Sequence, residues 1–235
     1  MEEKPYVEIY TDGAAEPNPG PGGYGVVLFC PKLNYKKEIS EGFVKTTNNR
    51  MELLAVIEGL KQLKYPSVVK VFSDSQYVVN AVSLGWLEKW EQNNWIRNKT
   101  EWVANDDLWK ELSHLLKVHD VSICWIKGHA GHSENERCDF LAVSAAKKEN
   151  RIEDMGYYAN ADKESKSLKI TKEGDFCRKC STPVVKIENR NPKKKKKHQY
   201  YYEYFFLCPK CKTYYMVEDA KRTYDLVGET GKLFE

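Results

Sequence analysis

Four carboxylates from distant parts of the chain could act together in one site. Asp12 and Asp74 each follow directly on a predicted strand, whereas Glu52 and Asp139 lie near the starts of predicted helices. In sheets with parallel segments, functional side chains collect at the carboxyl ends of neighbouring strands. Helix starts can return further side chains to that edge. The placement predicts that the four carboxylates meet.

Such a cluster would have a defined chemistry. Four carboxylates in one place repel one another and need divalent cations to neutralise them. Ligation by oxygen alone favours Mg²⁺ or Mn²⁺ over Zn²⁺. Two such ions about 3.5–4 Å apart suit phosphodiester cleavage, because one activates water and the other stabilises the leaving oxygen.

Each carboxylate also has a structural interpretation. Asp12 fits a turn before Gly13, and Asp74 could cap the helix that follows it. Two further pairs have the spacing of capping boxes at helix starts, namely Asn49 with Glu52 and Ser133 with Glu136, which places Asp139 in the second turn of its helix.

The cysteines predict a second metal site. Cys30, Cys124 and Cys138 stand apart in the sequence. The other four form two C-x-x-C pairs, Cys177 with Cys180 and Cys208 with Cys211. Paired knuckles in an intracellular chain argue for thiolates that bind metal rather than for disulfides. Four thiolates would bind one Zn²⁺ tetrahedrally with no position open to water, so we expect a structural zinc that helps a small domain to fold.

Alternating strand and helix patterns surround the carboxylates. We expect strands at 6–11, 25–29, 38–44, 68–72 and 121–126 and helices at 50–63, 76–84, 106–117 and 134–148. The order βββαβααβα predicts an α/β fold, a mixed sheet with helices against it. A polar, weakly patterned segment follows at 150–172 and reads as a linker. Strands at 183–188, 199–207 and 213–217 flank the knuckles and predict a small zinc-ribbon-like β domain.

Length and charge agree with this division. The 235 residues suffice for an ordinary domain at 1–149 and a smaller one at 173–235. Residues 1–150 carry 18 Lys and Arg against 21 Asp and Glu, whereas residues 151–235 carry 19 against 13, a hint of a polyanionic partner. The chain has no run of about 20 apolar residues and no export signal, so we expect no membrane segment and a cytoplasmic location, or a nuclear one in a eukaryote.

Four segments resemble the signature motifs of type 1 ribonuclease H. They are YTDGAAEPNPGPGGYG, KTTNNRMELLAVIEGL, VFSDSQYVVNAV and WIKGHAGHSENERCDFLA, and the resemblance covers roughly residues 5–149. It implies a five-stranded mixed sheet flanked by helices. It also implies an endonuclease that hydrolyses the RNA strand of RNA–DNA hybrids and leaves 5′-phosphate and 3′-hydroxyl ends.

The resemblance also implies roles for individual residues. Asp12, Glu52, Asp74 and Asp139 would hold two Mg²⁺ ions, which Mn²⁺ could replace, with Asp12 and Asp74 touching both ions. His129, or alternatively His132, would move a proton or help product leave; a surface histidine is the plainer interpretation.

Substrate contacts are implied at three places. The hybrid's minor groove would meet Asn18, Asn48 and Asn49, and a phosphate of the DNA strand would meet Lys45, Thr47 and Asn105. Trp86, Trp90 and Trp95 match a protruding handle that grips the DNA strand, although Trp95 could equally be a core residue. The handle is usually basic, but residues 83–105 carry only three cations against three acids.

The tail offers a further contact with nucleic acid. The lysine run from Lys193 to Lys197 precedes an aromatic strand, and lysines with exposed aromatics suit nucleic-acid binding. The same run could instead be a solvated loop or a nuclear-import signal. We expect a monomeric nuclease. The alternatives are a hybrid-binding or recruiting protein that does not cut, and a related nuclease that acts on DNA junctions or ends.

Overall fold

The computed structural model describes residues 4–98, 101–128, 130–165, 170–189 and 200–223, without the side chains of 162–165. The chain divides into two compact units, Met1–Lys166 and Ser167–Glu235. Each unit has its own cluster of buried side chains. In the part of the chain that is described, no helix has the length and apolar character needed to cross a membrane.

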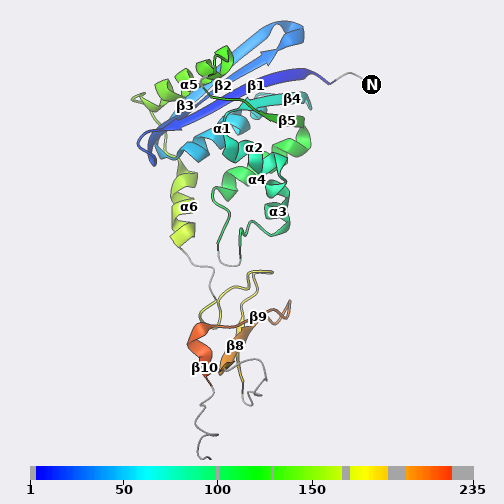
Figure 1. Cartoon of the computed structure of the whole chain (residues 1–235), viewed down its shortest axis with the longest axis vertical. Coiled ribbons are helices and arrows are strands. Elements are labelled where there is room, and N and C mark those ends of the chain that lie inside the picture. The colour runs from blue at the N-terminus through cyan, green and yellow to red at the C-terminus, as the bar shows by residue number, and fades with distance from the viewer. Residues whose placement is uncertain (1–3, 99–100, 129, 166–169, 190–199, 224–235) are drawn as a thin grey trace, which may run out of the picture. The chain divides into compact units, whose positions relative to one another are not determined.

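A five-stranded sheet forms the centre of unit 1 (Figure 1). Its strands lie in the order β3-β2-β1-β4-β5. The first three strands pair antiparallel, and β4 and β5 run parallel to β1, which confirms the expected mixed sheet. The bounds are β1 Tyr6–Ala15, β2 Gly20–Cys30, β3 Tyr35–Thr46, β4 Val68–Ser73 and β5 Asp120–Trp125, with a 3-10 turn, η1, at Pro31–Leu33.

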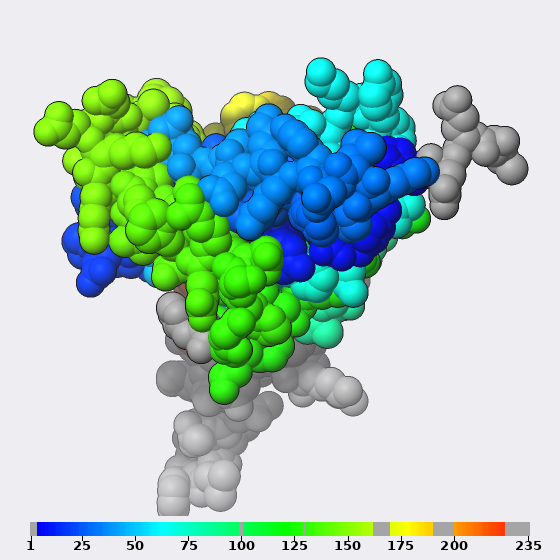
Figure 2. Space-filling model, turned by 90° about the horizontal axis from the view of Figure 1, so that it is seen from above, coloured from blue at the N-terminus to red at the C-terminus, as the bar shows by residue number. Residues whose placement is uncertain are grey.

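Helices cover both faces of this sheet. The helices of unit 1 are α1 Asn48–Lys61, α2 Gln76–Ser83, α3 Trp86–Gln92, α4 Asp106–Val118, α5 Ser133–Ala146 and α6 Met155–Ser165. On one face α1 packs so closely that a Cβ on Gly59 would press on Ile9 and Val26. On the opposite face, seen in Figure 2, α5 lies against β2 and β3, where a Cβ on Gly25 would overlap the carbonyl of Cys138.

The main core lies between the sheet and α1, with α2 and α4 beside it. Ile9, Met51, Val71 and Trp109 are fully buried there. The alternation of side chains along β1 explains the burial of Ile9. Val7, Ile9 and Thr11 are buried on one face of the strand, while the intervening residues face α5 or solvent. The sheet edge that carries the carboxylates is therefore fixed by a packed core.

The linker prediction is wrong for residues 150–165. Ile152 pairs with β3 through backbone hydrogen bonds to Gly42 and Val44, and α6 follows. Asp154, 4% exposed, forms a buried ion pair with Arg50 of α1. This segment joins unit 1 by polar contacts instead of an apolar stripe, which is why its sequence shows little periodicity.

Two smaller expectations are also wrong. The helix starts carry different caps: Thr47, not Asn49, caps α1, and His132 precedes α5 without a side-chain cap bond. The short helix α3 was not expected from the hydrophobic pattern.

Unit 2 contains two small sheets. One has the order β6-β8-β9, from Val185–Glu188, Tyr204–Leu207 and Tyr214–Tyr215. The other pairs β7 Tyr200–Tyr202 with β10 Lys221–Thr223, and a 3-10 turn, η2, lies at Glu218–Ala220. The single strand expected at 199–207 is broken at Glu203, whose N–H donates to the carbonyl of Ala220.

Candidate active site and metal centre

The strand register brings Asp12 and Asp74 to the same edge. Thr11 of β1 pairs with Ser73 of the parallel strand β4, so each aspartate is the next residue after a paired position. Glu52 reaches this edge from α1, because Gly13 lies so close to the start of that helix that a Cβ there would overlap the Glu52 N–H group. Only glycine allows this approach.

Asp139 comes from the opposite face. Its neighbour Cys138 donates from Sγ to the carbonyl of Tyr10, 3.2 Å away, and Gly25, which pairs with Asp12, packs directly under α5. Two helices on opposite faces thus direct carboxylates toward the carboxyl ends of the central strands.

The four carboxylates interact electrostatically. Burial, followed by the negative charges of its three acidic neighbours, raises the pKa of Asp12 to about 8. The Gly13 N–H, 2.7 Å from Asp12 Oδ1, acts in the opposite sense. Burial and the charge of Asp74 also raise the pKa of Glu52, against the hydrogen bond from Ser75. Full ionisation of the cluster is therefore unfavourable, and a divalent cation would favour it.

Three supporting residues were not expected from the sequence. The Ser75 hydroxyl donates to Glu52 Oε2 while it caps α2. Asn135 donates from Nδ2 to Asp74 Oδ2 at 3.5 Å. Gly128 leaves room for the same carboxylate, since a Cβ there would stand 2.6 Å from Asp74 Oδ2. A serine directly after Asp74 was the only sequence signal; the other two contacts depend on how β5 and α5 pack.

The donor set fits hard divalent cations. All four side chains offer carboxylate oxygens, the ligands that Mg²⁺ and Mn²⁺ prefer. Among the described residues, the buried Oδ1 of Asn135 beside them has no hydrogen-bond partner. A polar atom in this position could accept from a water that such an ion carries.

Only one of the two candidate histidines belongs to the described part of the chain. His129 lies outside the described residues. His132 is exposed and precedes α5.

Two of the expected minor-groove residues are linked directly. Asn18 Oδ1 accepts the Asn48 N–H at 3.3 Å, and Asn48 Oδ1 accepts the Ala15 N–H. These bonds tie the turn between β1 and β2 to the start of α1, next to Glu52. Asn49 is exposed beside them. The structure thus brings the three asparagines to the carboxylate edge.

Two of the three expected phosphate-contacting residues contact Arg50. Thr47 caps α1 by accepting the Arg50 N–H, and Asn105 Oδ1 accepts from the Arg50 guanidinium at 3.4 Å. Lys45 is exposed, with its ammonium 5.8 Å from the centre of the Tyr157 ring. Two short polar side chains therefore contact one buried arginine, and Lys45 lies beside a ring of α6.

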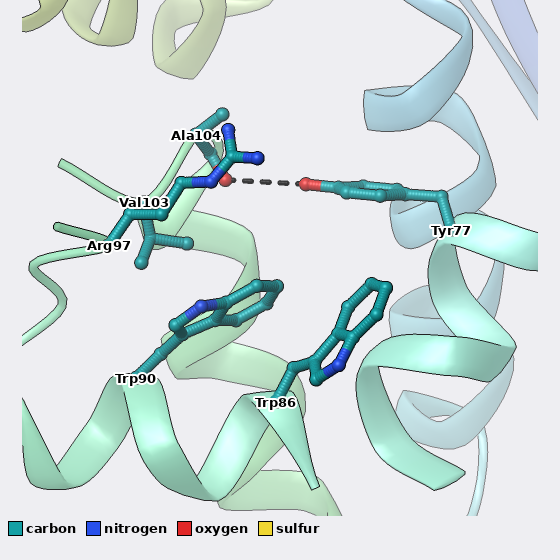
Figure 3. Close-up of a pocket in the computed structure, with 6 residues that line it drawn as sticks. All are labelled: Tyr77, Trp86, Trp90, Arg97, Val103 and Ala104. Atoms are coloured by element: carbon teal, nitrogen blue, oxygen red, sulfur yellow. Dashed lines mark hydrogen bonds between the residues drawn. The ribbon is translucent and has the colours of Figure 1, made fainter. Parts of the chain in front are cut away.

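Two of the three tryptophans expected in the handle, Trp86 and Trp90, line a pocket of about 360 Å³ (Figure 3). Its lining residues are Tyr77, Trp86, Trp90, Arg97, Val103 and Ala104. Trp86 and Trp90 have ring centroids 6.2 Å apart, and Trp86 is 36% exposed. Trp95 packs against the main core, which agrees with the core interpretation.

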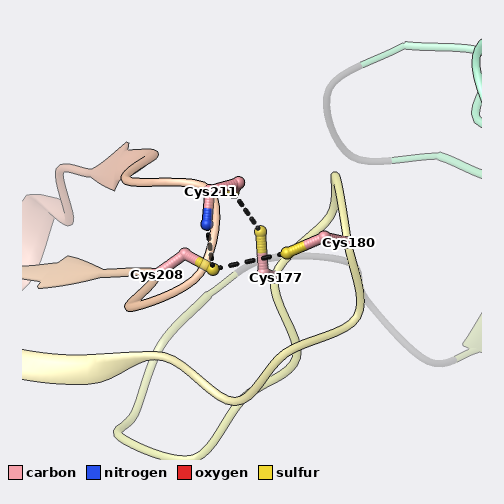
Figure 4. Close-up of side chains that lie close together, drawn as sticks. All are labelled: Cys177, Cys180, Cys208 and Cys211. Carbon is pink, nitrogen blue, oxygen red and sulfur yellow. Dashed lines mark hydrogen bonds between the residues drawn. The ribbon is translucent and has the colours of Figure 1, made fainter.

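The four paired cysteines converge in unit 2 (Figure 4). Their sulfur atoms all lie within 4.8 Å of one another. Cys177 and Cys211 are 3.4 Å apart, as are Cys180 and Cys208. A tetrahedron with Zn–S bonds of about 2.3 Å has S···S edges of about 3.8 Å, so the cluster fits Zn²⁺. A hydrogen bond with Thr213 lowers the pKa of Cys211 to about 6, which favours its thiolate.

A mixed sheet with acidic side chains gathered at the carboxyl ends of its central strands is the architecture of an α/β nuclease. The chain belongs to the ribonuclease H family, whose model (RNase H) matches residues 4–147. That match contains all four carboxylates and ends before the cysteine cluster.

Relatives and a solved structure also place this chain among the ribonucleases H. The Ribonuclease H of Desulforamulus reducens is 57% identical over 144 residues, 61% of this chain and 89% of that protein. The Ribonuclease H of Trichodesmium erythraeum is 49% identical, over 66% of this chain and 98% of its own length. The crystal structure of LC9-RNase H1, a type 1 RNase H with the type 2 active-site motif, is 30% identical with a TM-score of 0.56, covering 62% of this chain and 74% of that one. The chain is therefore an endonuclease of this family.

Proposed function

We propose that this chain hydrolyses the RNA strand of RNA–DNA hybrids and leaves 5′-phosphate and 3′-hydroxyl ends. The observation that carries the proposal is the convergence of Asp12, Glu52, Asp74 and Asp139 at one sheet edge in a chain of the ribonuclease H family. In this reaction water attacks the phosphorus, the bond to the 3′ oxygen breaks, and that oxygen takes up a proton.

The four carboxylates would hold two divalent cations, Mg²⁺ or Mn²⁺. When bound, these ions supply positive charge that activates the attacking water and stabilises the leaving oxygen. The chain's own contribution is orientation: Ser75 holds Glu52, Asn135 contacts Asp74, and Gly13 holds Asp12 by its N–H. We assign the proton transfer to His129, with His132 as the alternative.

Recognition of the hybrid would depend on short polar side chains. Only one strand of a hybrid carries 2′-hydroxyls, which are accessible from the shallow minor groove. Asn18, Asn48 and Asn49 lie beside the carboxylates and can donate and accept hydrogen bonds there. Lys45, Thr47 and Asn105 would hold a phosphate of the DNA strand, and Trp86 and Trp90 would pack against that strand. Cleavage should therefore depend little on sequence.

The test compares substrates and one variant. Purified protein with Mg²⁺ or Mn²⁺ should cut a labelled RNA–DNA hybrid and leave DNA–DNA and RNA–RNA duplexes intact. The Asp12→Asn variant should bind the hybrid without cutting it. Binding without cutting by the wild-type protein would instead support a recruiting role, and cleavage of DNA duplexes or junctions would support the related nuclease.

We also propose that the cysteine cluster holds one structural Zn²⁺ in unit 2. The spacing of the four sulfur atoms supports it. The site offers no place for a reacting water, so the ion would stabilise the fold only. A zinc-selective chelator should release one equivalent of zinc and leave Mg²⁺-dependent cleavage by unit 1 in place; no zinc in the purified protein would contradict the assignment.

Thiolates persist in a reducing compartment, which supports a cytoplasmic location.

A further inference from the structure

The three-stranded sheet of unit 2 has two apolar faces. Residues directly opposite one another in antiparallel strands share a face, and neighbours along a strand alternate. Phe206 pairs with Tyr215, and both are buried against the cysteine cluster. The adjacent pair, Leu207 and Tyr214, must therefore lie on the other face, and Tyr214 is 59% exposed.

The same register assigns further side chains to this outer face. Val185 pairs with Leu207 and Ile187 pairs with Phe205. Phe176, which pairs with Pro183 in an isolated bridge and precedes the buried Cys177, extends the face and is 67% exposed. We call this surface the outer face; its members are Phe176, Pro183, Val185, Ile187, Phe205, Leu207 and Tyr214. Three of the seven are aromatic.

Positive charge borders one end of the outer face. The second C-x-x-C knuckle, Cys208–Cys211, lies between β8 and β9; Lys210 lies within it and Lys212 follows it. Phe176 leads into the first knuckle, Cys177–Cys180, which contains Lys179. All three lysines are exposed. Unit 2 as a whole carries 16 Lys and Arg against 9 Asp and Glu, a formal net charge of +7. A polyanion is therefore the partner that the charge favours.

We infer that the outer face binds single-stranded nucleic acid, with unpaired bases stacked on Phe176, Phe205 and Tyr214 and phosphates contacting the knuckle lysines. Exposed rings on a sheet next to cations are the general means by which proteins hold single strands, because every base has an aromatic face. A duplex keeps its bases stacked inside and offers these rings nothing. The contact is separate from hybrid hydrolysis, because it uses another unit and other residues.

The experiment measures binding of a labelled oligothymidylate of about 12 nucleotides to the full-length, zinc-loaded protein without Mg²⁺, by fluorescence anisotropy. DNA without RNA is no substrate for the proposed hydrolysis, so this readout does not depend on cleavage. The wild-type protein should bind the single strand more tightly than a DNA duplex of equal length. The double variant Phe176→Ala/Tyr214→Ala should weaken binding at least tenfold while it keeps its zinc. Tyr65→Ala, which removes a similarly exposed ring from unit 1, should change nothing.

A second variant tests the inference even if the aromatic variant misfolds. Lys210→Gln/Lys212→Gln should flatten the dependence of log affinity on log salt by about 1.4, since each contact with a single strand contributes about 0.7. Unchanged affinity in a zinc-loaded aromatic variant overturns the inference. If that variant loses zinc, an unchanged salt slope in the lysine variant overturns it. Wild-type dimers that the aromatic substitutions dissociate, without oligonucleotide binding, would make the face a protein contact and also overturn it.

Discussion

Asp12 occupies a position that a folded protein without metal would disfavour. Its carboxylate is largely buried beside Asp74, Asp139 and Glu52, and its pKa rises to about 8 in consequence. A carboxylate kept in such a place costs stability, so its presence there points to a functional role. Stability and activity should therefore respond in opposite directions when this charge is removed.

We expect Asp12→Asn to lower cleavage of a hybrid at least about a thousandfold, because it removes one of the carboxylates proposed to hold the divalent cations. In Mg²⁺-free buffer the same variant should unfold at a higher temperature than the wild type, because mutual repulsion is relieved. Added Mg²⁺ should raise the midpoint of the wild type more than that of the variant. The control is Asp120→Asn, at an exposed position on β5. A lower midpoint for Asp12→Asn without Mg²⁺ would show that the carboxylate stabilises the fold.

The role of a side chain can be predicted from the sequence when a local pattern positions it, and not when contacts between distant elements do. Asp74 follows β4 as expected, whereas β1 continues past Asp12 to Ala15; strand patterns are local, so the shared edge of the two aspartates could still be predicted. Ser75, Asn135 and Gly128 owe their roles to contacts across elements, which one sequence does not encode locally. Their support of the carboxylates emerges only from the packing.

Helix α6 shows the same limit for a whole element. Its segment carries few apolar residues, so the pattern indicated a linker. The actual attachment is the buried guanidinium of Arg50, 2% exposed, which binds Asp154 and Asp107. Asp154 also accepts from Thr46 at 2.7 Å, and Asn160 of α6 donates to Asp107. One arginine thus joins α1, α4 and the residue before α6, and it also contacts Thr47 and Asn105.

Breaking this network should cost much more than breaking a surface pair. We expect Asp154→Asn to lower the free energy of unfolding of unit 1 by up to about 3–5 kcal/mol, because it removes one of the two carboxylates that compensate the buried Arg50. Glu38→Gln, which removes the exposed partner of Arg137, should cost less than about 1 kcal/mol. Denaturant titration measures both. Equal small effects would mean that water replaces the lost partner of Arg50.

The network also predicts a dependence on pH. Burial alone would raise the pKa of Asp107, but hydrogen bonds and charge from Arg50 outweigh it and lower the pKa. A carboxylate whose pKa is lower in the folded state stabilises the protein above the unfolded value, about 3.9, and loses this effect as the pH falls through the folded value. The difference in unfolding free energy between wild type and Asp107→Asn should therefore be constant near neutral pH and shrink below about pH 4. A difference that persists in acid would assign the effect to packing.

The whole chain joins an ordinary ribonuclease H unit to a basic, cysteine-rich unit that the family match does not include. The segment of unit 1 expected to form the handle, residues 83–105, carries three cations against three acids. Under the proposed function, charge would therefore add little to the contact between this segment and the DNA strand. The net charge of +7 on unit 2 offers what unit 1 lacks, namely attraction to a polyanion.

Removing unit 2 should reveal this division. The cut belongs after residue 166, since α6 and its ion pairs are part of unit 1. The shortened chain should fold, because relatives such as the Trichodesmium erythraeum protein are matched over 98% of their length by 156 residues. We expect kcat on a hybrid to stay within about twofold, while KM rises and its salt dependence flattens, because fewer counterions are released on binding. A hybrid with a single-stranded tail should show the larger rise in KM, since only that substrate offers unpaired bases to the outer face. Identical KM values and salt slopes for the two chains would mean that unit 2 plays no part in substrate binding.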